Sequence, residues 1–81
     1  MKLYQIRYFS AVCRCGYVTK AAEELHVSQP SVSNAVRDLE DEFGVNLFHR
    51  INNRLTPTKE GVIFLDRVSK ILDLADETAS Y

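Results

Sequence analysis

Residues 18–37 read VTKAAEELHVSQPSVSNAVR, and this stretch decides the fold. Ala22 and Leu25 fall on one face of a short helical pattern, and a turn of three or four residues separates it from a longer one. Ser28 is a good N-cap for that longer helix, and Pro30 follows in its first turn, where a missing N–H is harmless. A short helix, a tight turn and a longer helix in this order indicate a helix-turn-helix.

Apolar spacing and capping signals predict where the first three helices begin and end. Apolar residues recur at helical spacing from Leu3 to Cys13, and Gly16 follows as a stop signal. The short helix is expected over 18–25, with Thr19 as its N-cap. The longer helix is expected over 28–43, because an apolar stripe runs along it until the next glycine. His26 stands where such turns usually have glycine, and histidine tolerates a left-handed conformation there.

The helical spacing of apolar residues stops after the longer helix. Residues 47–50 and 54–56 flank the triplet 51–53, whose paired asparagines tolerate the positive φ angles of a tight turn. Pro57 cannot donate to a continued ladder. We therefore expect a short β-hairpin that ends at this proline.

The last segment predicts a long helix over 58–81. Thr58 is its N-cap, and Glu60 lies in the first turn, where the helix dipole favours an acid. The helix is apolar over a wide arc, so one flank can pack on the domain while another pairs with a second copy of the chain. The residues assigned to this dimer contact are Phe64, Leu65, Val68, Ile71, Leu72 and Ala75.

These elements predict a mainly α protein. Residues 1–57 form a winged helix-turn-helix of three helices and a hairpin wing, and residues 58–81 form a linker and dimerisation helix.

The start of the longer helix carries short polar side chains and two amides. Gln29 and Asn34 can bond bidentately to the N6/N7 edge of adenine, and the ring of Pro30 can contact a thymine methyl group. Ser31 and Ser33 can reach a phosphate or a base. The same pattern is also typical of a solvated first turn rich in capping residues, so the helix alone leaves both interpretations open.

The hairpin adds two basic residues beside a polar turn. Arg50 and Arg54 suit a wing that lies on the phosphate backbone or in the minor groove of DNA. A charged hairpin edge that resists aggregation is the alternative.

The charge of the chain is divided into blocks. Ten Lys and Arg against eleven Asp and Glu give a net charge of −1, which as a sum argues against a nucleic-acid binder. Residues 1–37 nevertheless carry five basic and two acidic groups, and residues 50–70 carry the same numbers, so each block has +3. Residues 38–49 carry −4 and residues 71–81 carry −3. The positive blocks contain the helix-turn-helix and the wing, which can therefore face DNA.

Composition and motifs disfavour an enzyme and a membrane protein. The chain has no Gly-x-Ser-x-Gly elbow, phosphate loop or HExxH pair, so we expect no catalytic residues, no metal and no cofactor. Cys13 and Cys15 lie two apart on a helix, where they cannot close an unstrained disulfide. No apolar run approaches a membrane span or a signal peptide, which favours a cytoplasmic protein.

Four motifs together resemble the LysR-type transcriptional regulators of bacteria. They are AAxxLHVSQPSVS over 21–33, RYF over 7–9, LExxFGVxLFxR over 39–50 and TxxG over 58–61. The resemblance covers essentially the whole chain. It implies sequence-specific binding of double-stranded DNA as a dimer, with the helix 28–43 in the major groove, the wing on the backbone or in the minor groove, and the linker helices paired.

The resemblance also implies roles for individual residues. Base contacts map onto Gln29, Pro30, Ser33 and Asn34. Backbone and wing contacts are assigned to Thr19, Ser28, Ser31, Arg37, Arg50 and Arg54. Asn34 stands where the family often has Arg or Lys, which removes a charged contact. Asn53 stands where many members have a wing arginine, so the minor-groove role is assigned to Arg54.

The family has a longer chain, in which an effector-binding domain follows the linker helix. On this resemblance the sequence is the DNA-binding portion without that domain. A small-molecule effector and a higher oligomer are expected only of the full-length protein. A winged-helix module that binds another protein in place of DNA stays open as the alternative function.

Overall fold

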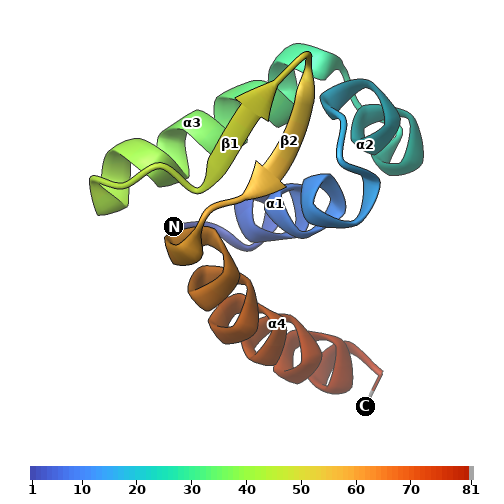
Figure 1. Cartoon of the computed structure of the whole chain (residues 1–81). Coiled ribbons are helices and arrows are strands. Elements are labelled where there is room, and N and C mark those ends of the chain that lie inside the picture. The colour runs from blue at the N-terminus through green and yellow to red at the C-terminus, as the bar shows by residue number, and fades with distance from the viewer. Residues whose placement is uncertain (81) are drawn as a thin grey trace.

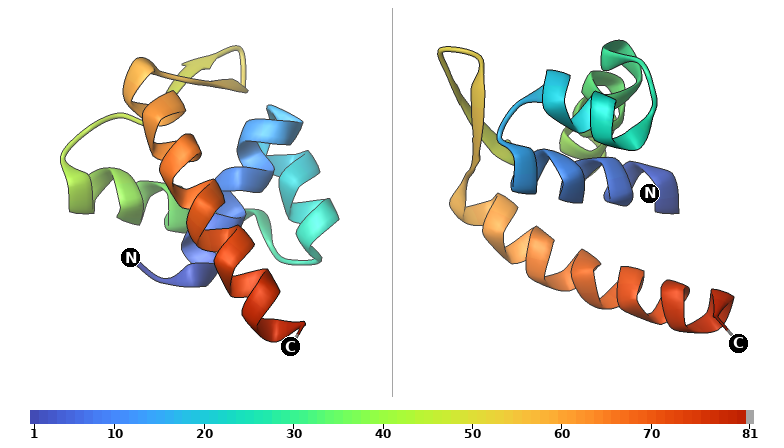
Figure 2. Two further views of the ribbon diagram at one scale, coloured as in Figure 1. Left: turned by 90° about the horizontal axis from the view of Figure 1, so that it is seen from below. Right: turned by 90° about the vertical axis from the view of Figure 1, so that its right-hand side faces the viewer.

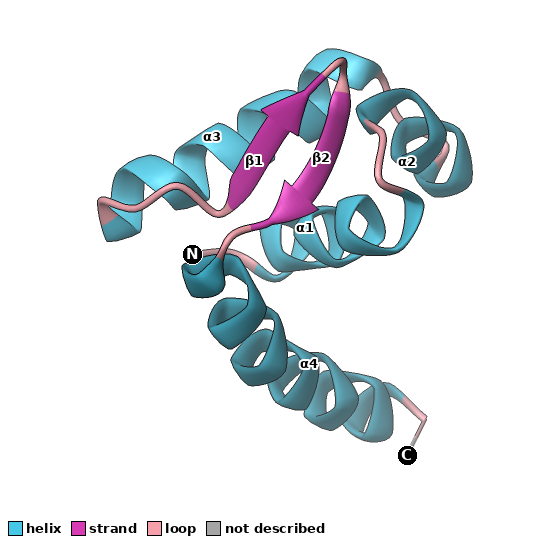
Figure 3. Ribbon diagram, in the orientation of Figure 1, coloured by secondary structure: helices cyan, strands magenta, loops and turns pink. Residues whose placement is uncertain are grey.

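The computed structural model describes residues 1–80, which form four helices and one antiparallel pair of strands (Figure 1, Figure 3). The elements in chain order are α1 (Leu3–Cys15), α2 (Val18–Leu25), α3 (Gln29–Phe43), β1 (Phe48–Ile51), β2 (Arg54–Pro57) and α4 (Lys59–Ala79). The predicted winged helix-turn-helix with a long C-terminal helix is confirmed. Within residues 1–80, no helix has both the length and the apolar character that crossing a bilayer requires.

Each of the first three helices ends at a residue whose backbone adopts the left-handed conformation. Gly16 has φ 78°, and its N–H bonds to the carbonyl of Val12 at 2.8 Å. His26 takes φ 58° after α2, and Gly44 takes φ 67° after α3. The left-handed position of His26 was expected. It lets a non-glycine residue make the turn between α2 and α3.

Side-chain caps begin two of the helices. The Oγ of Ser28 accepts the N–H of Ser31 at 3.2 Å, and the Oγ1 of Thr58 accepts the N–H three residues on at 3.0 Å. Both N-caps were predicted. The N-cap predicted at Thr19 is wrong, because Tyr17 occupies that position in an extended conformation without a side-chain cap. The chain already turns at the preceding glycine, so α2 starts at Val18, one residue before the threonine.

The hairpin is tighter than expected. Ile51 pairs with Arg54, so the turn contains only Asn52 and Asn53, which take φ 50° and 68°. The prediction that Ile51 belongs to the turn is therefore wrong. A two-residue turn with both φ angles positive matches the right-handed twist of the two strands. The two asparagines supply those angles by themselves, so Ile51 is free to pair in β1. Pairing ends at Pro57, as its missing N–H predicts.

Helix α1 lies at the centre of the core. The ring of Phe9 is fully buried, with ring centroids 5.2 Å from Phe48 and 5.0 Å from Phe64. Figure 2 shows α4 passing beneath α1, on the side away from α2 and α3. The largest fully buried side chains are Phe9, Ile6, Leu39, Leu47, Val12, Val32, Val36 and Val68.

Backbone hydrogen bonds fix the hairpin to the helices. The N–H of Leu55 donates to the carbonyl of Gly16 at 2.8 Å, beside the turn between α1 and α2. The N–H of Leu47 donates to the carboxylate of Glu40 at 2.8 Å, and the carbonyl of Leu47 accepts the N–H of Thr58 at 3.0 Å. The wing is therefore held at both of its ends by groups that lie outside the sheet.

Candidate nucleic-acid interface

Helix α3 buries one face and exposes its first turn. Its buried residues are Val32, Ala35, Val36 and Leu39. Gln29, Pro30 and Asn34 are exposed on the other side, and Ser33 is half-buried between the two faces. The residues predicted to contact bases therefore share the solvent side of one helix start, where the side chains are short enough for a duplex to approach.

Hydrogen bonds along α3 join four of the predicted contact residues in two pairs. The hydroxyls of Ser28 and Ser31 lie 2.8 Å apart at the N-terminus of the helix. The guanidinium of Arg37 donates to the Oδ1 of Asn34 at 2.9 Å. Arg37 thus directs one N–H toward the amide oxygen, and the NH2 group of Asn34 makes no hydrogen bond within residues 1–80. The amide keeps donors available to a base edge.

The two wing arginines point to different neighbours. Arg50 in β1 lies 3.4 Å from the Oε1 of Glu40, a carboxylate whose side chain is only 14% exposed. Arg54 in β2 lies over the ring of Tyr17, with its Cζ 6.0 Å from the ring centroid. Both guanidinium groups keep part of their surface in solvent. The wing therefore presents one arginine beside α3 and one beside the start of α2.

A hollow lies between the start of α2, the start of α3 and the wing. It brings together Thr19, Gln29, Ser33 and Arg50 from the predicted interface. Pro30, Asn34, Arg37 and Arg54 are not among its lining residues. The full lining is Tyr17, Val18, Thr19, Gln29, Ser33, Arg50, Asn52, Asn53 and Leu55. Among the described residues no Asp or Glu lines it, so a phosphate there meets only neutral and positive side chains.

Sequence reasoning missed Tyr17 and the two turn asparagines as lining residues. Tyr17 was assigned no role, and Asn52 and Asn53 were assigned only to the turn. Their place in the hollow depends on how the hairpin packs against the turn between α1 and α2. No local pattern in the sequence carries that information.

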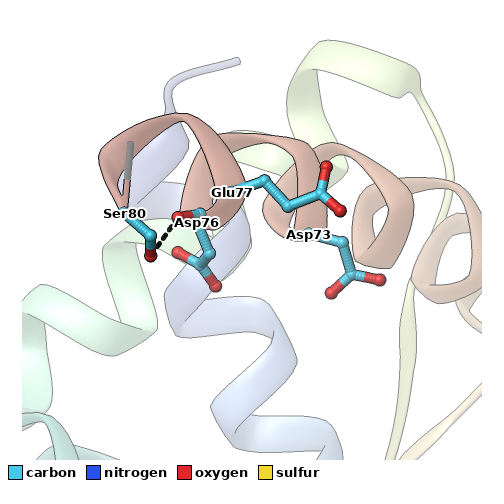
Figure 4. Close-up of a pocket in the computed structure, with 4 residues that line it drawn as sticks. All are labelled: Asp73, Asp76, Glu77 and Ser80. Atoms are coloured by element: carbon cyan, nitrogen blue, oxygen red, sulfur yellow. Dashed lines mark hydrogen bonds between the residues drawn. The ribbon is translucent and has the colours of Figure 1, made fainter.

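A second hollow, at the far end of α4, has the opposite charge. It is lined by Asp73, Asp76, Glu77 and Ser80 (Figure 4). The Ser80 hydroxyl donates to the Asp76 carbonyl at 2.9 Å, and the Asp76 carboxylate pairs with Arg7 at 3.0 Å. Within residues 1–80 no group of His, Cys, Asp or Glu is placed to hold a metal ion. This acidic end of the molecule disfavours a phosphate, and the exposed ion pair links α4 to α1.

The thiols of Cys13 and Cys15 are held in their neutral, weakly nucleophilic form. Burial raises the pKa of Cys13 to about 12, so this thiol is neutral at physiological pH. Partial desolvation and the Glu24 carboxylate raise the pKa of Cys15. Both cysteines are free, and a neutral thiol is a poor nucleophile and metal ligand.

The sequence and the fold agree with a known protein family. The sequence of residues 3–62, which is most of the chain, matches the family model described as bacterial regulatory helix-turn-helix protein, lysR family. This chain is a member of the LysR family. Curated relatives include the RuBisCO operon transcriptional regulator of Allochromatium vinosum, which is 51% identical over 61 residues, 75% of this chain and 20% of that protein. The Hca operon transcriptional activator HcaR of Escherichia coli is 43% identical over 76 residues, 94% of this chain and 26% of that protein.

Solved structures of LysR-family proteins superpose closely on this one. The DNA-binding domain of CbnR in complex with DNA is 36% identical, with a TM-score of 0.92 over 99% of this chain and 92% of that one. The DNA-binding domain of BenM with benA site 1 DNA is also 36% identical, with a TM-score of 0.91 over 99% of this chain and 93% of that one. The chain spans about a fifth to a quarter of the length of the curated relatives above.

Most of the residues of α4 that were predicted to form the dimer contact pack on the core of the same chain in this LysR-family protein. Val68 is 1% exposed, and Phe64, Leu65 and Leu72 pack against the same cluster. Val68 therefore has no surface left for a second copy, whereas Phe64, Leu65 and Leu72 pack on the domain and keep part of their surface exposed. The periodicity was right, but it does not say which flank of a helix is covered. The large apolar side chains that α4 exposes are Val62, Ile63, Ile71 and Leu74.

Proposed function

We propose that this chain is the DNA-binding part of a LysR-type transcriptional regulator and binds double-stranded DNA with α3 in the major groove. The observation that carries the proposal is the hollow between α2, α3 and the wing, lined by amide, hydroxyl and guanidinium groups and no carboxylate among residues 1–80. The close superposition on two domains solved with DNA supports it. The C-terminal end of α4 is acidic, which favours an orientation in which this end points away from the duplex.

The proposed roles follow the exposure of each side chain. Gln29 and Asn34 read base edges, Pro30 contacts a thymine methyl group and Ser33 lies between them. Arg50 binds the backbone beside α3, and Thr19 binds it beside α2. Ser28, Ser31 and Arg37 complete the backbone contacts along α3, where two of them already form a hydrogen-bonded pair.

A salt titration separates DNA binding from the rival function of a protein-binding winged helix. Sites are first selected from random duplex DNA with this chain, and the affinity for the selected palindrome is then measured between low and physiological salt. We expect about 5–7 phosphate contacts per half-site, so the affinity falls steeply as the salt concentration rises. A flat salt response, or failure to retain any duplex in the selection, contradicts the proposal.

Gln29→Ala is expected to lose discrimination at one A·T pair by about 1–3 kcal/mol while the salt dependence hardly changes. Gln29 is exposed at the first turn of α3, so its removal leaves the core intact. The measurement compares the affinities of wild type and variant for the selected site and for single-base variants of it. Asn46→Ala removes an exposed amide outside the hollow and serves as the control. An equal loss on every sequence would make Gln29 a positioning residue.

We further propose that the chain dimerises through the exposed flank of α4. Ile63, Ile71 and Leu74 recur at helical spacing on this flank, and Leu74 is 64% exposed. Ala75 borders the flank and is half-buried. This surface replaces most of the stripe predicted from the sequence and leaves Val68 in the core.

Leu74→Glu is expected to weaken self-association by about tenfold or more, because a carboxylate buried in an apolar contact without a partner is costly. The monomer should remain as stable as wild type, since the side chain is exposed in it. Sedimentation velocity over a range of concentrations measures the dimer fraction. Val62→Glu is the matched control, with 57% exposure on a different side of the helix. Equal self-association of wild type and Leu74→Glu would rule out this flank.

A further inference from the structure

The ring of Tyr17 at the start of α2 has two cations beside it. The Nζ of Lys20 lies 5.1 Å from the ring centroid, and the Cζ of Arg54 lies 6.0 Å from it. Both distances are within the range of cation–π attraction. Lys20 comes from the same helix, one turn further on, whereas Arg54 comes from β2. A single aromatic side chain therefore joins positive groups from the helix-turn-helix and from the wing.

The backbone fixes Arg54 in this position. The hydrogen bond from the N–H of Leu55 to the carbonyl of Gly16 holds β2 against the turn before Tyr17. A Cβ placed on Gly16 would lie 3.9 Å from the Nε of Arg54, so the side chain passes directly over this residue. The arginine thus lies along the turn between α1 and α2, with its guanidinium group at the tyrosine ring.

The two cations are not neutralised within the described part of the chain. Neither Lys20 nor Arg54 forms an ion pair with a carboxylate of residues 1–80. Glu24, one turn beyond Lys20, is paired with Arg14 at 2.7 Å. Two positive charges beside one aromatic ring, neither with a counter-ion, favour an anionic ligand.

This cluster adjoins the proposed DNA surface. Tyr17 lines the same hollow as Thr19, Gln29 and Arg50. A duplex whose major groove contains the start of α3 therefore passes beside the ring and its two cations. The anion that such a duplex offers at this position is a backbone phosphate.

We propose that Lys20 and Arg54 bind a backbone phosphate of duplex DNA and that Tyr17 is their positioning residue. The inference rests on the proposed function, adds a contact at the edge of the interface, and places Arg54 on the backbone in place of the minor-groove role that the resemblance implied. The ring holds two long side chains together before DNA arrives, so they lose less conformational entropy when they engage the phosphate. A phosphate contact does not depend on sequence, and this site therefore raises affinity for every duplex equally.

Tyr17→Leu and Tyr17→Phe test the positioning role. We expect the leucine variant to bind about threefold to tenfold more weakly, by equal factors for the selected palindrome and for an unrelated duplex. The phenylalanine variant keeps an aromatic face and should bind like wild type. Fluorescence anisotropy with labelled duplexes measures the affinities, and thermal unfolding checks that both variants fold.

Charge removal tests the phosphate contact itself. The double variant Lys20→Gln/Arg54→Gln should make the fall of log affinity with log salt less steep by about 0.9, because it removes the contact to one phosphate, and each single variant should change the slope by less. Tyr17→Leu should leave that slope unchanged, since both cations remain. In the double variant without Lys20 and Arg54, the leucine substitution should have no further effect.

Three results would overturn the inference. They are wild-type affinity in Tyr17→Leu, an equal loss in Tyr17→Phe, or an unchanged salt slope in the double glutamine variant. Lys20 and Arg54 are exposed, so the glutamine variants test the site even if the leucine variant fails to fold. The proposed function survives each of these results, because it fails only when the wild-type chain binds no duplex or binds with a flat salt response.

Discussion

Gly61→Ala is expected to destabilise the domain by about 3 kcal/mol or more, through a steric conflict at the junction of the wing and α4. A Cβ at this position would overlap the carbonyl oxygen of Leu47 and would lie 3.3 Å from the Cβ of Pro57. The carbonyl cannot swing away freely, because it accepts the N–H of Thr58 at 3.0 Å. The N–H of Leu47 is held by Glu40 at the same time. Relief of the overlap therefore requires α4 to move away from the hairpin.

Helix propensity predicts the opposite sign. Alanine stabilises a helix interior by about 1 kcal/mol relative to glycine, so a helix free of contacts would gain from this substitution. Urea unfolding followed by circular dichroism measures the change in the free energy of unfolding. Gly44→Ala is the control, since it has φ 67° and open space around its Cβ position. We expect that control to lose about 1–2 kcal/mol from left-handed strain alone. A smaller loss for Gly61→Ala than for Gly44→Ala would refute the steric explanation.

Phe9→Ala is expected to reduce the free energy of unfolding by about 3–5 kcal/mol. The ring is fully buried in α1 and meets Phe48 of β1 and Phe64 of α4. Its removal leaves a cavity at the point where the wing and the C-terminal helix both join the core. A domain of this size has limited stability to lose, so the variant should be close to unfolding at 37 °C.

Tyr4→Ala is the matched control for this substitution. Tyr4 is also an aromatic residue of α1, but it is 47% exposed and only pairs edge-on with Tyr8 at 5.4 Å. We expect a loss of less than about 1.5 kcal/mol there. Urea unfolding of both variants gives the comparison. If the two losses agreed, the cluster around Phe9 would not be the part of the core that joins these elements.

Much of the fold could be predicted because short-range chemistry determines it. Ser28 and Thr58 cap their helices with their own side chains, and Gly16 and Gly44 end helices with a left-handed backbone. Each of these signals acts within a few residues, so a pattern in the sequence expresses it directly. The exposed first turn of α3 could be predicted for the same reason. The cap fixes where that helix begins, and the buried stripe fixes which side faces outward.

The site could be predicted only in part. The exposed face of α3 that carries the predicted contacts follows from the sequence, but the hollow that collects Thr19, Gln29 and Arg50 depends on where the hairpin packs. Tyr17 was missed because its neighbour Arg54 comes from a distant strand. The turn chemistry of the wing gives its shape and contains no information about the surface on which it rests.

The sequence by itself determined the order of helices, the presence of the hairpin wing, the four motifs of the family and the alternating blocks of charge. Only the tertiary structure decided which flank of α4 is free, which arginine lies beside which element, and why Gly61 has no room for a side chain. Helical periodicity defines a face through the backbone geometry of one segment. What covers that face depends on contacts between segments far apart in the chain, which no single segment encodes.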